Sequence, residues 1–401
     1  MRKVISYGKQ DITPEDIDAV VDVLKGDFLT QGPKIKEFEE KFSKYIGCKY
    51  SIAVSNGTAA LHLCAIALNV NKNSRVITTP ITFSASANCV KYCGGEVEFI
   101  DIDPETYLLD YNKVKEALEN SPLGTYCGII LVDFAGRSVN TELFRNLAEK
   151  YNLWIIEDAC HAPGANFIDS KGVIQNSGNG VYADLSIFSF HPVKHIACGE
   201  GGMITTNDFS LYNRIMKLRT HGITKNSDQF INSIELATFS KDNLQYPGWY
   251  MEMQELGYNY RLTDFQAALG ISQLSRASNG LVKRIEIAKT YDEAFVNNNK
   301  IKTSLLQLNN NFLDKHAYHL YIIEVENRLG LYNFLRENNI FSQVHYFPIH
   351  LMPYYQNLGW KKGDLLNAEN YYKNCLSLPI YPTLTSEEQQ FIIEKINSFC
   401  K

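Results

Sequence analysis

The sequence predicts an α/β protein with a large domain over residues 1–275, built on a mostly parallel sheet, and a smaller α+β domain over 276–401. Short apolar strand segments alternate with helical segments through the first part, a pattern typical of a parallel sheet covered by helices on both faces. This alternation changes after about residue 275, and 401 residues are enough for two domains.

The composition is that of an ordinary globular protein, with 45% hydrophobic and 21% charged residues. A net charge of −5 gives no basic surface for nucleic acid or an anionic membrane. No apolar run approaches the roughly 20 residues of a membrane span, and the first residues lack a signal-peptide core. Nine cysteines without paired metal spacing predict reduced thiols and no metal site. We therefore expect a cytoplasmic enzyme.

The first element expected is a helix within residues 11–26. Thr13 is a favoured capping residue, Pro14 suits the first helical position, and Gly26 suits the stop. The residues expected to form its apolar face are Ile17, Val20, Val21 and Leu24.

A strand over 50–55 follows, and a turn at 56–58 joins it to an apolar helix over 60–68. A further helix is expected at 140–152. The other short apolar segments expected to form strands are 75–80, 96–103, 128–136 and 153–159.

The second domain is expected to begin with a strand over 316–326 and a helix over 327–339. Another strand, over 342–350, is expected to lead into a loop, and the last helix starts within 385–396. Ser386 and Gln389 have the spacing of a capping box for that helix. The N-terminal residues are assigned with the large domain, although their pattern allows packing against either one.

Residues 55–61 (SNGTAAL) place a glycine turn between a strand and a helix. Free N–H groups and the positive end of the helix dipole make such a helix start a phosphate-binding site. Gly57 permits the tight turn, and Thr58 stands near the helix start. Because Asn-Gly-Thr is also a common turn and cap, this segment alone leaves both interpretations open.

Asp158 stands near the end of the apolar strand expected over 153–159, at the carboxyl end where open parallel sheets bind ligands. A carboxylate there can pair with a cationic ring nitrogen. Alternatively, it can simply cap the next helix.

Lys194 lies in an apolar, aromatic and glycine-rich stretch, residues 188–202 (FSFHPVKHIACGEGG), which has no helix or strand periodicity. Desolvation disfavours the ammonium and lowers the pKa of such a lysine, and the neutral amine condenses with carbonyls to give Schiff bases. The alternative is a half-buried lysine that extends to water. Nearby, Ser189 can donate its hydroxyl to a phosphate or be an ordinary loop serine.

Together, a phosphate-binding turn, an aspartate for a ring nitrogen and a Schiff-base lysine are the requirements of pyridoxal 5′-phosphate. Lys194 comes 36 residues after Asp158. With these motifs in this order, the chain resembles the nucleotide-sugar aminotransferases of the DegT/DnrJ/EryC1/StrS family, which have the aspartate aminotransferase-like fold type I of pyridoxal-phosphate-dependent transferases. The resemblance runs nearly end to end, through the segments LTQG, SNGTAAL, TTPITFSASAN, EDACHA, GYNYRLTD and VHYFPIH.

The resemblance implies that Lys194 forms the Schiff base with the cofactor, that Asp158 pairs with the pyridinium nitrogen, and that Phe83 stacks on the ring. Lysine at 194 favours amino transfer, because a dehydratase branch of this family has histidine at that position. During transfer, the lysine freed from the cofactor would move a proton between the donor carbon and the cofactor.

Other cofactor-binding positions follow from the same resemblance. Gly57, Thr58 and Ser189 match phosphate-binding positions, and His161 stands where relatives have glutamine or histidine near the ring hydroxyl. Asn259 matches an asparagine that reaches the phosphate of the neighbouring subunit, which implies a homodimer with shared active sites.

The sequences of several segments are most similar to the branch that moves an amino group from glutamate to C4 of a UDP-linked 4-keto-6-deoxy-N-acetylhexosamine in pseudaminic acid biosynthesis. This similarity implies the candidate substrate-binding residues Tyr7, Leu29, Thr30, Gln31, His319, Tyr321, His345 and Tyr346. These residues could equally belong to the core or to a dimer interface.

Two alternatives stay open: an aminotransferase that makes a 4-amino pentose or a 3-amino hexose, and a regulator that binds pyridoxal phosphate without turnover. A cysteine hydrolase using Cys160 and His161 is disfavoured, because adjacent residues rarely face each other as nucleophile and base.

Overall fold

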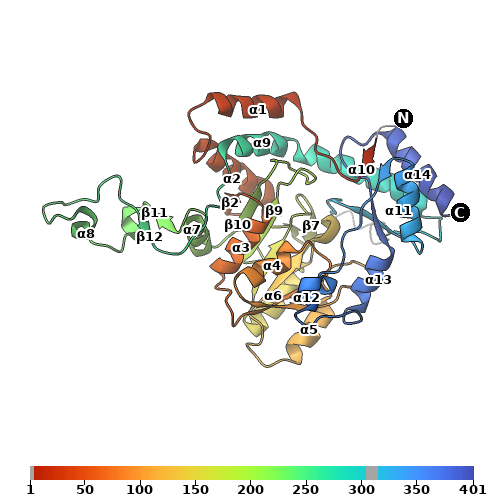
Figure 1. The fold of residues 1–401 in the computed structure, drawn as a ribbon, viewed down its shortest axis with the longest axis horizontal. Coiled ribbons are helices and arrows are strands. Elements are labelled where there is room, and N and C mark those ends of the chain that lie inside the picture. The colour runs from red at the N-terminus through yellow and green to blue at the C-terminus, as the bar shows by residue number, and fades with distance from the viewer. Residues whose placement is uncertain (1–3, 304–314) are drawn as a thin grey trace.

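The computed structural model describes residues 4–303 and 315–401, and its centre is a seven-stranded sheet (Figure 1). Strand β10 runs antiparallel to its neighbours β2 and β9, and all other neighbours in the sheet are parallel. The predicted mostly parallel sheet is therefore confirmed. In sheet order the strands are β2 (Tyr50–Val54), β10 (Gly202–Thr206), β9 (Leu185–Ser189), β6 (Trp154–Asp158), β5 (Gly128–Val132), β3 (Arg75–Thr78) and β4 (Glu96–Phe99).

Successive residues of the central strands pack on opposite faces of this sheet. Ile130 and Ile156 belong to a core that includes α3, α4 and α7, whereas Ile129 and Ile155 belong to a core that includes α5 and α6. Helices α2 and α9 contribute a further core with Met203. The helices that accompany the sheet are α1 (Pro14–Lys25), α2 (Pro33–Ile46), α3 (Gly57–Ala67), α4 (Ala85–Tyr92), α5 (Tyr111–Glu119), α6 (Thr141–Tyr151), α7 (Phe209–Leu218) and α9 (Asp264–Ser275).

Helix α1 lies on the outside of the body, against α9 (Figure 1). Its predicted limits are confirmed, since Thr13 is the N-cap and Gly26 the C-cap. The predicted apolar face is wrong, however. Ile17 and Leu24 are 56% and 55% exposed, and the helix is instead fixed by Asp16, whose buried carboxylate bonds Arg276 and Gln273.

The C-terminal part has its own hydrophobic core between α10, α11, α14 and a small sheet. The expected boundary falls between α9, which ends at Ser275, and α10, which begins at Ala277. Residues 5–6 pair with residues 340–341 of this part, whereas α1 packs on α9 of the large unit. The elements are β1 (Ile5–Ser6), α10 (Ala277–Phe295), β13 (Lys302–Thr303), β14 (Tyr321–Glu324), α11 (Arg328–Glu337), β15 (Ile340–Phe341), η4 (Ile349–Leu351), α12 (Pro353–Gln356), α13 (Leu366–Asn374), β16 (Cys375–Leu378) and α14 (Ser386–Phe399).

Two local predictions in this part are wrong. The strand expected over 342–350 is largely irregular, because the regular pairing ends at Phe341 and the segment turns toward the large sheet, where the Ile349 amide bonds Pro80. The last helix is capped one residue earlier than expected: Thr385 is the N-cap and Glu388 completes the capping box.

An arm over residues 223–253 projects from the body beyond α7 (Figure 1). Its exposed side chains include Phe239, Leu244 and Trp249, at 91%, 89% and 73% exposure. The arm contains β11 (Ile223–Thr224), η2 (Ser227–Gln229), α8 (Ile234–Thr238) and β12 (Glu252–Met253). Outside the arm, the remaining elements are the paired short strands β7 (Asn166–Ile168) and β8 (Ile174–Asn176) and the short helix η1 (Phe134–Gly136).

Candidate active site

A cavity of about 680 Å³ opens at the carboxyl ends of three neighbouring parallel strands. Val132 ends β5, Asp158 ends β6 and Ser189 ends β9, and all three line the cavity. This is the edge at which open α/β sheets bind ligands.

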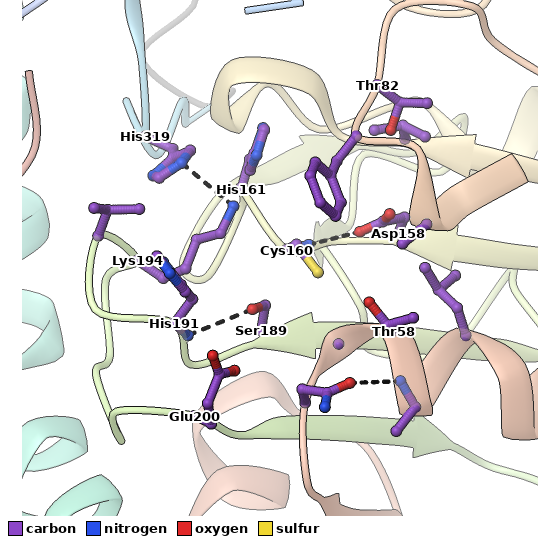
Figure 2. A pocket seen from close by; sticks show the side chains of 18 of the residues that line it. Thr58, Thr82, Asp158, Cys160, His161, Ser189, His191, Lys194, Glu200 and His319 are labelled. Carbon is purple, nitrogen blue, oxygen red and sulfur yellow. Dashed lines mark hydrogen bonds between the residues drawn. The ribbon is translucent and has the colours of Figure 1, made fainter. Parts of the chain in front are cut away.

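One end of the cavity is the start of α3. Asn56 is the N-cap, and its Oδ1 accepts a hydrogen bond of 2.8 Å from the Ala59 amide. The amides of Gly57 and Thr58 make no hydrogen bond within residues 4–303 and 315–401, and both residues line the cavity. Ser189 Oγ lies at the same end and accepts a bond from the His191 amide, which leaves its proton free to donate (Figure 2). The result is a group of unpaired donors suited to a phosphate.

At the other side of the cavity, two donors hold the carboxylate of Asp158, which Figure 2 shows beside Cys160. Ser86 Oγ donates to Oδ2 at 2.7 Å, and the Cys160 amide donates to Oδ1 at 3.2 Å. The carboxylate is therefore fixed by its own strand turn and by α4. Such an acid can hold a proton on an aromatic ring nitrogen.

Lys194 follows β9 in a turn and extends its side chain into the cavity toward His319 and His161 (Figure 2). Burial lowers the pKa of its ammonium, although the charge of Asp158 acts in the opposite direction. Nζ lies 3.4 Å from His319 Nε2. The prediction of a desolvated lysine with a lowered pKa is thus matched by its surroundings.

Histidines form the wall beside Lys194. The rings of His161 and His319 lie 4.3 Å apart. Burial, followed by the charge of Lys194, holds the pKa of both rings well below the usual value, and the same two causes lower that of His345 to about 3. All three rings are therefore neutral at physiological pH.

The cavity brings most of the predicted site residues together. Leu29, Thr30, Gln31 and Asn259 do not line it, and all four are exposed. Tyr321 is also absent from it: this side chain is 1% exposed, and its hydroxyl donates to Asp292 in the C-terminal core. The predicted residues that line the cavity are Tyr7, Gly57, Thr58, Phe83, Asp158, His161, Ser189, Lys194, His319, His345 and Tyr346.

Sequence reasoning missed several polar residues of the site, among them Ser86, Tyr260 and Glu200. Ser86, which bonds Asp158, stands three positions after Phe83, in the first turn of α4. Tyr260 and Glu200 both line the cavity. Each belongs to a segment already singled out by its motif, which is the signal that would have found them.

The cavity fits pyridoxal phosphate. Backbone comes close at the phosphate end, where a Cβ on Gly202 would lie 2.6 Å from the Asn56 carbonyl and one on Gly57 would lie 3.1 Å from Ser189 Cβ. Free donors at this end, the fixed carboxylate and the desolvated amine match the phosphate, ring nitrogen and aldehyde of this cofactor. Fold and cavity together define a pyridoxal-phosphate-dependent transferase.

Comparison with known proteins identifies the family. The chain belongs to the DegT/DnrJ/EryC1/StrS aminotransferase family, which it matches over residues 10–397. It is therefore a sugar aminotransferase that uses pyridoxal phosphate.

Individual relatives cover nearly the whole chain. The UDP-4-amino-4,6-dideoxy-N-acetyl-beta-L-altrosamine transaminase of a Campylobacter jejuni strain is 37% identical over 98% of this chain and 97% of its own length. The structure of Helicobacter pylori PseC, an aminotransferase involved in the biosynthesis of pseudoaminic acid, has a TM-score of 0.84, with 31% identity and 99% coverage of each chain. The PLP form of the putative sugar aminotransferase Spr1654 from Streptococcus pneumoniae has a TM-score of 0.85, with 27% identity and 99% coverage of each chain.

No group of histidine, cysteine and carboxylate side chains within 4–303 and 315–401 has an arrangement that could hold a metal ion. None of the helices in these ranges combines the length and hydrophobicity that a membrane span requires.

Proposed function

We propose that this enzyme transfers an amino group from glutamate to C4 of a UDP-linked 4-keto-6-deoxy-N-acetylhexosamine, as a step of pseudaminic acid biosynthesis. The observation that carries the reaction type is the convergence of Lys194, Asp158 and the start of α3 on one cavity. The sugar is supported by the name of the Campylobacter relative.

The roles of the residues follow from their chemistry. The cofactor, when bound, supplies an electron sink for the carbanion at the donor carbon. The start of α3 and Ser189 would bind its phosphate, Asp158 would hold a proton on its ring nitrogen, and Phe83 would stack on the ring. Because burial lowers the pKa of Lys194, its Nζ would accept and return a proton more readily than an exposed lysine.

We further propose that the active enzyme is a homodimer with shared sites. Among the described residues that line the cavity, Lys194 is the only lysine or arginine, while Asp158 and Glu200 are acidic. The proposed ligands, by contrast, carry phosphate, diphosphate and carboxylate groups. Positive charge and amide donors from a second copy would balance them.

Exposed residues of this chain suit such a partner role. The loop 29–31 packs against the start of α9, where Thr30 bridges Thr263, and Asn259 lies in the bridge to Thr220. Neither group reaches the cavity of its own chain. Apolar side chains are exposed nearby on α1 and along the arm. We expect these surfaces to bury each other in the dimer, with Asn259 reaching the phosphate site of the second copy.

We place the enzyme in the cytoplasm. All nine cysteines have free thiols, as expected in a reducing compartment.

A substrate panel tests the proposed reaction. Purified enzyme is incubated with glutamate and UDP- or dTDP-linked 4-keto and 3-keto sugars, and amino-sugar formation is followed by mass spectrometry. We expect turnover of the UDP-linked 4-keto-6-deoxy-N-acetylhexosamine and loss of turnover in Lys194→Ala, with Lys361→Ala, a change at an exposed lysine, as the control. Turnover of a 3-keto sugar alone would overturn the C4 assignment. A visible absorption band that glutamate leaves unchanged would indicate a regulator without catalysis.

A further inference from the structure

A directional chain of hydrogen bonds runs from a backbone turn to the cavity. The Ala135 amide donates to His161 Nδ1 at 3.3 Å, and His161 Nε2 lies 3.2 Å from the hydroxyl oxygen of Tyr346. Both side chains line the cavity. The order of donors and acceptors along this chain can be worked out from the first bond.

The amide of Ala135 can only donate, so His161 Nδ1 must be the unprotonated nitrogen of the ring. Burial and the nearby charge of Lys194 keep this ring neutral. A neutral imidazole carries one proton, which must then sit on Nε2. Consequently Nε2 donates and Tyr346 accepts.

Tyr346 therefore does not use its own proton in the bond to His161. Burial raises the pKa of this phenol, which stays protonated at physiological pH. Its hydroxyl makes no second hydrogen bond within the part of the chain that the structure describes. Since the side chain lines the cavity, the free O–H is available to a bound ligand.

We propose that Tyr346 is a hydrogen-bond donor to an acceptor-only oxygen of the bound ligand, and that His161 is the residue that positions this donor by holding the Nε2-protonated tautomer. The inference rests on the proposed function, because it requires a ligand oxygen in the cavity. Two sources offer such an oxygen: the ring oxygen of the cofactor and the keto oxygen of the sugar.

The turn that fixes the tautomer is itself held in place. Ala135 has a φ of 61°, in the left-handed region that non-glycine residues seldom adopt. Its carbonyl accepts from the Leu320 amide, and the Gly136 carbonyl accepts from the Ala317 amide. These two bonds tie the turn to the segment that carries His319. These bonds hold the turn in the conformation that directs the Ala135 amide at His161.

The first test reads the tautomer directly and needs neither cofactor nor turnover. The full-length protein is labelled with nitrogen-15 histidine, and His161→Gln assigns the resonance. We expect an Nε2-protonated, neutral ring between pH 6 and 8 in the cofactor-free protein. An Nδ1-protonated or charged ring would overturn the proposal.

The second test separates the donor from a packing role by a matched pair of variants. In His161→Gln the amide nitrogen can replace Nε2 as the donor to Tyr346, whereas in His161→Asn the shorter side chain replaces Nδ1 only. With the proposed 4-keto sugar and glutamate, we expect the first to keep kcat/KM within about threefold and the second to lose about tenfold, the effect of one hydrogen bond. Equal losses in both variants would contradict positioning through Nε2.

The third test locates the oxygen with Tyr346→Phe, and Tyr354→Phe, at an exposed tyrosine, is the control. A shifted visible absorption band and weaker cofactor binding would assign the cofactor oxygen. An unchanged band and an unchanged glutamate half-reaction, with about tenfold lower kcat/KM for the keto sugar, would assign the sugar. Either result supports the donor role, and the double variant with His161→Asn should then be no worse than Tyr346→Phe alone. If Tyr346→Phe alters neither measurement in an enzyme that turns over, the donor role fails while the proposed function stands.

Discussion

Adding one methyl group at Gly202 should disable the phosphate end of the cavity. Gly202 begins β10 and lies against the turn that starts α3. A Cβ there would be 2.6 Å from the carbonyl carbon and oxygen of Asn56 and 3.0 Å from the Gly57 nitrogen. The neighbours that it meets are backbone atoms, which cannot rotate away as a side chain would. Gly202→Ala is therefore a small change with a predictable direction.

The magnitude follows from the contact distances. Ordinary carbon contacts begin at 3.4 Å, so the turn must retreat by about 3.4 − 2.6 = 0.8 Å. A hydrogen bond of about 2.9 Å lengthened by that amount is no longer effective. If two charge-assisted bonds from Gly57 and Thr58 to the phosphate are lost at about 1.5 kcal/mol each, cofactor binding weakens by about 3 kcal/mol, or roughly a hundredfold. Overpacking should also lower the free energy of unfolding by about 1–3 kcal/mol.

The assay is a titration of cofactor-free protein with pyridoxal phosphate, followed by visible absorption, together with urea unfolding of the cofactor-free protein. The matched control is Gly280→Ala on α10, where an added Cβ meets only Pro382 Cγ at an ordinary 3.5 Å. This control should bind cofactor normally and unfold at the same or slightly higher urea concentration. If Gly202→Ala binds cofactor as tightly as wild type, the start of α3 is not the phosphate site.

Three more variants test other parts of the structure. Ser86→Ala removes the 2.7 Å bond to Asp158, so kcat should fall about tenfold with cofactor retained; an unchanged kcat would contradict this. Burial opposes ionisation of Asp16, but bonds from Arg276 and other donors outweigh it and lower its pKa from 3.8 to about 2. Ionised Asp16 therefore adds about 2 kcal/mol to the free energy of unfolding, a contribution that is complete above about pH 4 and lost toward pH 2. Asp16→Asn should accordingly lower the stability to urea at pH 7 but have little effect at pH 2. Phe239→Asp, on the exposed arm, should weaken dimer formation measured by sedimentation. An unchanged dimer would exclude this part of the arm from the dimer interface.

The sequence predicted those features that depend on neighbours along the chain. Thr13, Pro14 and Gly26 mark the limits of α1 because capping is a local interaction. The same reasoning failed for the apolar face of this helix, since burial depends on what covers it. Ile17 and Leu24 face outward in one chain, where only a second molecule could cover them.

The candidate site divides in the same way. The chemistry of Lys194 and Asp158 could be predicted from the sequence, because each stands in a motif whose composition is unusual for its side chain. The protonation state of the site could not be predicted, because it depends on contacts between segments that are distant in the sequence. His161 obtains its tautomer from Ala135, 26 residues earlier, and contacts Tyr346, 185 residues later.

The neutral histidines of the cavity wall show how contacts between distant segments set the environment of a residue that a local motif identifies. A positive charge beside Lys194 would lower its pKa further, but His161, His319 and His345 bring none, because burial keeps their own rings neutral. Were any of them protonated, its charge would meet the ammonium of Lys194 in a site with little solvent. The charge of Asp158 acts in the opposite direction and raises the pKa of this lysine. The lowered pKa of Lys194 therefore comes mainly from burial among distant segments, which is why its motif alone could also describe a lysine that reaches water.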